Sequence, residues 1–243
     1  MNKLENILTQ LCSCYTVSGS ELEGFSVIKN LLPQNALLES DCNGNIIATL
    51  GNINSDDVIL LDAHNDRIGL IVEYIDDNGF LKVSNCGGID RRVLAGSVVT
   101  VLGSKPLRGI ISCLPPHLSD GAEDKAPKNG TLYIDTGLNK TEVEKYVSPG
   151  DKVAVFAKPK KLIGSKFSAA GLDNKAGVAS LIRTAQIIAD SNINSCVKIL
   201  FSSQEETGLL GSRTASFKIN PSCAVVVDVS FASQPSVPAD KCG

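Results

Sequence analysis

The sequence has no hydrophobic run long enough to cross a membrane and no sign of an export signal. Its longest apolar runs, such as Val58–Leu61 and Ala224–Val227, have the length of strands, far below the ~20 residues that a membrane span needs. The N-terminal residues Met1–Glu5 lack a basic segment followed by an apolar one, which is the layout of a signal peptide. We therefore expect a cytoplasmic protein.

The chain also lacks a strong net charge, low-complexity segments and internal repeats. Its 23 basic and 26 acidic residues give a net charge of -3, which argues against nucleic acid or a membrane surface as a partner. The absence of a repeat of fixed period argues against a solenoid or a propeller. With 243 residues, of which 43% are hydrophobic, the chain can form a sizeable core, and we expect a soluble globular protein.

The eight cysteines do not form a metal-binding or redox motif. They fall at no zinc-finger spacing, and Cys12 and Cys14 are too close together for a C-x-x-C pair. A chain of this size does not need disulfides for stability. We expect reduced and mostly buried thiols with no chemical role.

Hydrophobic periodicity predicts an α/β domain interrupted by an all-β insertion. The first two predicted helices cover residues 4–14 and 20–32, and Ser20-Glu21-Leu22-Glu23 has the pattern of a capping box. Short alternating strands separated by turn residues occupy about 69 to 160, which is typical of a small barrel or sandwich. The remaining expected strands are residues 37–39, 45–50, 57–62, 195–202 and 223–229, and the later helices are residues 174–189 and 209–217.

One of only two histidines lies at the end of an apolar strand. His64 follows Leu61-Asp62-Ala63, and open α/β sheets place their ligands at the carboxyl ends of strands. Imidazole is a common ligand of zinc-like metals, and Asp66 could orient it. Taken alone, this pair also fits a structural histidine.

Acidic residues occupy three further positions of the same kind. Asp173 precedes a predicted helix, where it could bind a metal or merely cap the helix. The adjacent Glu205 and Glu206 follow a buried-type strand, and two neighbouring carboxylates repel each other unless a cation or a proton separates them. A solvated acidic turn is the alternative.

Asp228 closes the run Val225-Val226-Val227, which is so apolar that we expect a central strand. A charge at the end of such a strand is costly unless it is paired or metal-bound, although it could also end the strand in a solvated turn. Three strands of one sheet and one helix start thus present acidic or imidazole ligands at one edge. Carboxylates with few histidines and no thiolates suit paired zinc, cobalt or manganese ions.

At this point the sequence resembles the family of glutamyl or tetrahedral aminopeptidases, which are co-catalytic metallopeptidases, some of them labelled endoglucanases. The resemblance runs from the first helices to the last residues. It rests on the acidic clusters and on an ordered set of motifs, namely Ala63-His64-Asn65-Asp66-Arg67-Ile68-Gly69, Gly79-Phe80-Leu81, Gly87-Gly88, Pro116-His117-Leu118, Tyr133-Ile134-Asp135 and Thr136-Gly137.

The resemblance implies a metal-dependent aminopeptidase that removes N-terminal residues from peptides through a metal-activated water. His64 and Asp228 would hold one metal ion, Asp173 would bridge two, and Glu206 would hold the second. Glu205 would be the general base. Asp66 would assist catalysis by supporting the histidine, whereas His117 lies in the insertion and is left out of the site.

The implied fold is a metallopeptidase α/β/α sandwich with a barrel-like insertion. Residues 1–66 and 165–243 would form the catalytic domain, and residues 67–164 would form a lid that also assembles homo-oligomers, dodecamers in relatives. Such relatives continue beyond the length of this chain, through further strands and a late histidine ligand. We therefore expect a domain that is incomplete at its C-terminus, with one tightly bound metal ion rather than two and weak or no activity.

Three residues depart from the family pattern. Asn65 and Arg67 replace the usual neighbours of the histidine, and Asn174 stands where an aspartate is common beside the bridging position. These changes alter the local charge more than the ligand set. Two other functions stay open, namely a related two-metal amidohydrolase such as a deacylase or carboxypeptidase, and an assembly or binding module with an impaired site.

Overall fold

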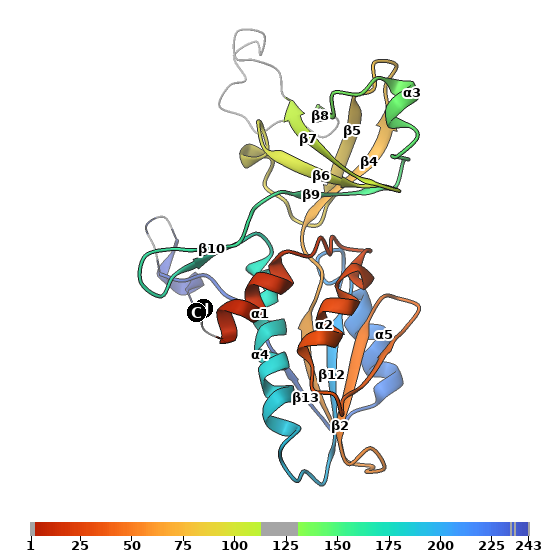
Figure 1. Cartoon of the computed structure of the whole chain (residues 1–243). Helices are drawn as coiled ribbons and strands as arrows, with labels where there is room; N and C mark the ends of the chain where they lie inside the picture. Colours follow the sequence, from red (N-terminus) through yellow and green to blue (C-terminus); the bar gives the residue numbers. More distant parts are fainter. Residues whose placement is uncertain (1–2, 113–130, 234, 236, 243) are drawn as a thin grey trace. The chain divides into compact units, whose positions relative to one another are not determined.

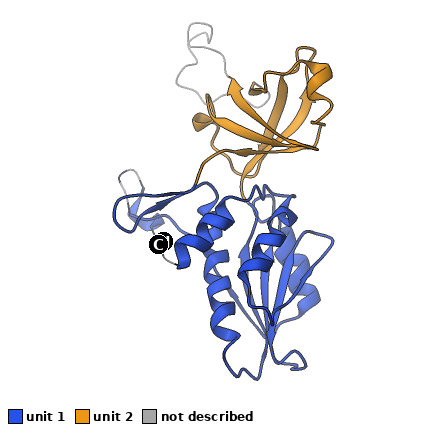
Figure 2. Ribbon diagram, viewed as in Figure 1, with its two compact units in different colours: residues 1–66, 159–243 blue, residues 67–158 orange. Residues whose placement is uncertain are grey.

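A computed structural model describes residues 3–112, 131–233, 235 and 237–242. The chain forms two compact units (Figure 2). Unit 1 comprises residues 1–66 and 159–243, and unit 2 comprises residues 67–158. His117 and Cys113 lie in the segment 113–130, so the expectations for these two residues fall outside the described residues.

Unit 1 is built on a five-stranded mixed sheet. Its spatial order is β1 (Leu37–Ser40), β2 (Ile46–Gly51), β12 (Cys196–Ser202), β3 (Val58–His64) and β13 (Cys223–Val226). The first two strands form an antiparallel hairpin, and β2 also pairs antiparallel with β12. The strands β12, β3 and β13 are parallel, with Ser202 opposite His64. Their carboxyl ends therefore meet at one edge of the sheet.

Helices cover both faces of this sheet (Figure 1). One face packs against α1 (Lys3–Cys12), α2 (Phe25–Leu31) and α4 (Leu172–Ile188), and α5 (Leu210–Ile219) packs on the other. Buried aliphatic residues such as Ile7, Ile28 and Ile182 meet the apolar sheet side chains on the first face. Unit 1 also contains η1 (Glu21–Gly24), η4 (Ala239–Lys241) and a two-stranded ribbon of β10 (Lys160–Lys161) and β11 (Phe167–Ser168).

Unit 2 is a closed antiparallel barrel, in agreement with the expected all-β insertion. Its core is lined by alternating apolar residues, including Leu81, Val99, Ile134 and Val153, which are almost completely buried. This alternation follows from strands that turn one face inward and the other toward solvent. The strand order is β4 (Gly69–Ile75), β5 (Leu81–Cys86), β8 (Tyr133–Asp135), β7 (Pro106–Ser112), β6 (Val98–Leu102) and β9 (Lys152–Val155), with the short helices η2 (Arg91–Val93) and α3 (Lys140–Val143) between strands.

Two local expectations are wrong. The predicted helix over residues 20–32 is divided into η1 and α2, and the Ser20 side chain caps neither. Instead, the Glu21 carboxylate accepts a hydrogen bond from the backbone N–H of Gly19 at 2.7 Å. The barrel unit ends at Lys158 rather than 164, because Lys160–Lys161 pairs with Phe167–Ser168 in unit 1.

The strand that precedes Asp228 is not central. Among the described strands, β13 pairs only with β3, and all four of its residues are exposed. Val225 and Val226 keep 49% and 68% of their surface accessible. An apolar run predicts a strand, but it does not determine the position of that strand in the sheet.

Two further expectations concern the burial of the cysteines and the absence of a membrane-spanning helix. All seven described cysteines are free thiols, but only Cys12, Cys86 and Cys196 are buried, so the expectation of mostly buried thiols is wrong. Among the described helices, none combines the length and the apolar character that a membrane crossing requires.

The core of unit 1 gives a direct stability prediction. Phe201 on β12 is completely buried, whereas Phe217 on α5 is 90% exposed. We expect Phe201→Ala to lower the free energy of unfolding by about 3–5 kcal/mol through the cavity it creates, and Phe217→Ala to change it by less than about 0.5 kcal/mol. Urea unfolding followed by circular dichroism of the helices checks this, and equal losses in the two variants would contradict the assigned core.

Candidate functional site

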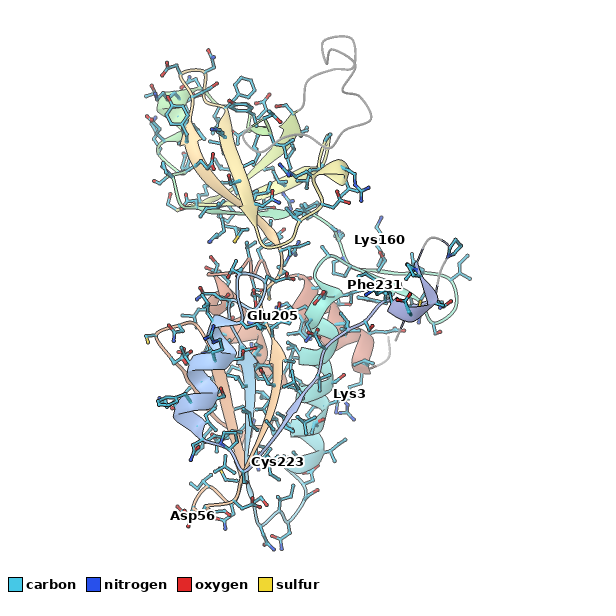
Figure 3. The ribbon with its side chains drawn as sticks, turned by 180° about the vertical axis from the view of Figure 1, so that it is seen from behind. Lys3, Asp56, Lys160, Glu205, Cys223 and Phe231 are labelled. Carbon is cyan, nitrogen blue, oxygen red and sulfur yellow. The ribbon has the colours of Figure 1, made fainter. Side chains whose placement is uncertain are left out.

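The predicted ligand residues converge at the carboxyl edge of the parallel strands. His64 is the last residue of β3, Glu205 and Glu206 follow β12, and Asp228 follows β13. Figure 3 shows Glu205 at the opposite end of the sheet from Asp56 and Cys223, which mark the beginnings of β3 and β13. The parallel pairing of these strands explains why residues distant in sequence meet here.

Carboxylates surround one nitrogen of the buried histidine. His64 Nε2 lies 3.0 Å from Asp173 Oδ1, 3.8 Å from Asp228 Oδ1 and 3.9 Å from Glu205 Oε2. The imidazole side chain is only 3% exposed, whereas those of Asp173 and Asp228 are 62% and 50% exposed. The cluster therefore has a buried base and an acidic, solvent-accessible rim.

Asp66 lies beneath the histidine and also holds the acidic turn. Its Oδ1 is 3.5 Å from His64 Nδ1, and its backbone carbonyl is 3.2 Å from the same nitrogen. The backbone N–H groups of Glu205 and Glu206 donate to its two carboxylate oxygens at 3.0 and 3.1 Å. One completely buried carboxylate thus orients the imidazole and fixes the two acids that follow β12.

Asp173 and Asn174 depart from helical geometry near the start of α4, and Asn174 rather than Asp173 caps the regular helix that follows them. The Asn174 Oδ1 accepts a hydrogen bond from the N–H of Gly177 at 3.0 Å, and its amide donates to the Val227 carbonyl at 2.7 Å. A Cβ atom on Gly177 would collide with the Asn174 side chain. The capping alternative for Asp173 is therefore wrong, and its carboxylate is directed to His64.

Glu21 is a site-supporting residue that the sequence analysis missed. It is only 2% exposed, and its Oε1 accepts hydrogen bonds from the N–H groups of Gly19 and Gln204. Gln204 has a left-handed backbone, with φ at 54°, immediately before the two acids. Together, Glu21 and Asp66 therefore bind three successive N–H groups of this turn. The only signal in the sequence was the acid-rich segment 20–23, which we interpreted as a helix cap.

The titration properties of His64 and Asp66 reflect their pairing. Burial alone would lower the pKa of His64, but the carboxylates of Asp66, Glu205 and Asp173 raise it to about 9. Burial alone would raise the pKa of Asp66, but hydrogen bonds from His64, the Glu205 N–H and other donors lower it below its usual range. In the absence of other cations, the carboxylates thus favour a protonated imidazole.

In contrast to Asp66, the two acids after β12 have raised pKa values. Burial and then the charge of Asp173 raise the pKa of Glu206 to about 7. Burial also raises the pKa of Glu205, and the charges of Asp66 and Asp228 add to this effect while His64 opposes it. The site therefore concentrates negative charge that protons or cations can neutralise.

This donor set fits a divalent cation. Ligand atoms of His64, Asp173 and Asp228 lie within 4.8 Å of one another, and the same holds for His64, Glu205 and Glu206. One imidazole and several carboxylates, without thiolates, match the ligand preferences of zinc, cobalt and manganese. A cation in either group would replace the positive charge that the imidazolium otherwise supplies.

Asp62 lies next to the cluster but has a different environment. It is 6% exposed, and its Oδ1 is buried with no hydrogen-bond partner among the described residues. Burial raises its pKa to about 6, which the Ser202 hydroxyl and His64 partly oppose. A cavity of about 320 Å³ adjoins it and is also lined by His64, Glu205 and Asp228.

The raised pKa of Asp62 predicts a pH-dependent stability of the metal-free protein. Its folded pKa of about 6 exceeds the ordinary value of 3.8, so between these values the folded state holds a proton that the unfolded state has lost. This contribution is complete below about pH 4 and disappears as the pH rises to about 6. As the pH rises from 4 to 7.5, we expect the free energy of unfolding of Asp62→Asn to increase by about 1–3 kcal/mol relative to that of the unsubstituted protein.

Urea unfolding at the two pH values measures this difference. Asp56→Asn, a change at an exposed aspartate two residues before β3, serves as the control and should show no such gain. Parallel pH profiles of the Asp62→Asn variant and the unsubstituted protein would show that Asp62 is not protonated by burial.

Known proteins resemble both the sequence and the fold. The family model described as M42 glutamyl aminopeptidase matches residues 44–242. The lysyl aminopeptidase of Pyrococcus furiosus is 32% identical over 79% of this chain and 56% of its own length. The chain therefore spans little more than half of that relative.

Solved aminopeptidase structures resemble nearly the whole chain. An aminopeptidase from the archaeon Desulfurococcus kamchatkensis superimposes with a TM-score of 0.89 and 28% identity, over 98% of this chain and 66% of its own. The TET1 peptidase of Pyrococcus horikoshii, described as assembling into a tetrahedron or a large octahedral shell, gives 0.87 and 31%, over 96% of this chain and 71% of its own. These similarities confirm the expected mixed α/β fold with its barrel.

Proposed function

Because this chain belongs to the M42 glutamyl aminopeptidase family, we propose that it is a metal-dependent aminopeptidase that removes N-terminal residues from peptides. The observation that supports this most strongly is the arrangement around His64. One buried imidazole nitrogen lies within 4 Å of carboxylates from α4, from the turn after β12 and from the segment after β13. Such a set can bind divalent ions beside a solvent-accessible surface.

The proposed ligands divide into two groups that share Asp173. His64 and Asp228 would hold one divalent ion together with Asp173, and the mutual proximity of their ligand atoms supports this group. Glu206 would hold a second ion with Asp173. When bound, zinc, cobalt or manganese ions would polarise the peptide carbonyl and lower the pKa of a water molecule.

Glu205 is the proposed general base. Its raised pKa and its position beside His64 suit a group that accepts a proton from water and later returns it to the leaving amine. Asp66 keeps Glu205 in place through the hydrogen bond from the Glu205 N–H, and it keeps the imidazole oriented. The partly exposed rim and the adjoining cavity leave room for a peptide end.

We also propose that the chain forms homo-oligomers, with unit 2 as the lid and the assembly surface. The support is the shell formation described for the Pyrococcus horikoshii neighbour and the independent barrel core of unit 2. The dodecameric state expected from the resemblance belongs to the same proposal.

The activity can be tested with aminoacyl p-nitroanilides in the presence of zinc, cobalt or manganese. We expect weak, metal-dependent release of p-nitroaniline, in line with the expectation of one tightly bound ion, and Glu205→Gln should lower its kcat by about 10²–10⁴-fold while metal binding persists, because the amide cannot accept the proton. Glu39→Gln, at an exposed position on β1, is the matched control and should leave kcat unchanged.

A panel that includes N-acyl amino acids separates the alternatives. Hydrolysis of these compounds without hydrolysis of the anilides would overturn the aminopeptidase assignment in favour of a related amidohydrolase. A protein that binds metal but cleaves neither class would be an assembly or binding module instead.

A further inference from the structure

A buried lysine contacts the segment that holds the histidine. Lys175 on α4 is only 1% exposed, and its Nζ donates to Thr16 Oγ1 at 2.7 Å. The same ammonium group lies 2.5 Å from both the backbone carbonyl and the side-chain Oδ1 of Asn65. These three acceptors match the three N–H donors of a lysine, and both acceptor residues are completely buried.

The bond joins two segments that contain proposed metal ligands. Asn65 lies between His64 and Asp66 at the end of β3, and Lys175 follows Asp173 by two residues at the start of α4. These elements are far apart in sequence, and no covalent constraint sets the distance between His64 and Asp173. A contact from Lys175 to Asn65 therefore constrains the approach of one ligand to the other.

The other polar groups of Asn65 are also bonded. Its N–H donates to the Ser202 carbonyl at 2.8 Å, at the end of β12. Its side-chain amide donates to the Glu21 carbonyl at 3.2 Å, and its own carbonyl also accepts from the Thr16 hydroxyl at 2.8 Å. Hydrogen bonds thus connect the residue between His64 and Asp66 to the end of β12, to Glu21 and, through Lys175, to α4.

We propose that Lys175 is a positioning residue for the metal site, which fixes the His64 segment relative to Asp173 by binding Asn65. This inference rests on the proposed function, because it assumes that His64 and Asp173 bind the same ion. A buried ammonium group is costly unless its hydrogen bonds are satisfied, and here they are made to the residue between the ligand histidine and Asp66. Residues that orient ligands from behind typically change metal affinity by 10- to 100-fold when they are replaced.

The test compares Lys175→Met with Lys198→Met. Methionine keeps the unbranched side chain but removes the charge and the donors. Lys198 is a half-buried lysine on β12 that donates to Thr49, and it provides the matched control. We expect Lys175→Met to weaken zinc or cobalt binding, measured by calorimetry, by about 10- to 100-fold, and Lys198→Met to leave it unchanged.

The visible spectrum of bound cobalt supplies a readout that a loss of stability alone would not change. We expect the bands to shift in Lys175→Met at metal saturation, because the ligand geometry changes, and to stay constant in Lys198→Met. If Lys175→Met fails to fold, Thr16→Val removes one acceptor of Lys175, together with the Thr16 hydrogen bond to the Asn65 carbonyl, with little change in volume. It should weaken cobalt binding several-fold.

The outcomes separate the two proposals. An unsubstituted protein that binds neither zinc nor cobalt overturns the proposed function. Metal binding that is equal in affinity and spectrum between the unsubstituted protein and Lys175→Met, or Thr16→Val where it is the variant used, overturns the role of Lys175 alone. Equal weakening by the Lys175 and Lys198 substitutions also overturns it, because the effect would then be general.

Discussion

The mutual repulsion of carboxylates around one buried imidazole is the constraint on which the rest of the site depends. Asp173 and Asp228 come from different elements, yet both lie within 4 Å of His64 Nε2. Like charges at such distances separate unless positive charge lies among them. The parallel pairing aligns the strand ends, and Asp66 binds the N–H groups of the turn after β12. The cation of the proposed metal site would supply the positive charge among these acids.

The residues that depart from the family pattern each have a structural partner. Asn65 binds Lys175 and Glu21, and Asn174 caps α4 while bonding to Val227. Within unit 2, the Arg67 guanidinium donates to the Val155 carbonyl at 2.9 Å. None of these three residues is a proposed metal ligand. The departures therefore change the hydrogen bonds around the site, and the set of donor atoms stays the same.

The sequence was sufficient to predict the strand ends, and thus His64 and the acids at one edge, because parallel strands align their carboxyl ends. It could not reveal Glu21, whose partner Gln204 is distant in sequence, nor the pairing of Lys175 with Asn65. Such contacts depend on tertiary packing, which leaves no local periodicity. The apolar run of β13 likewise predicted a strand, but not that it is the last strand in the order of the described sheet, next to β3 alone.

Anomalous diffraction from crystals of the protein grown with zinc tests most directly whether His64, Asp173 and Asp228 bind one metal ion. We expect a zinc peak at the carboxyl end of β3, about 2.0–2.2 Å from His64 Nε2 and from the carboxylate oxygens of Asp173 and Asp228. A peak elsewhere, or no peak while His64 stays hydrogen-bonded to Asp173, would contradict this expectation.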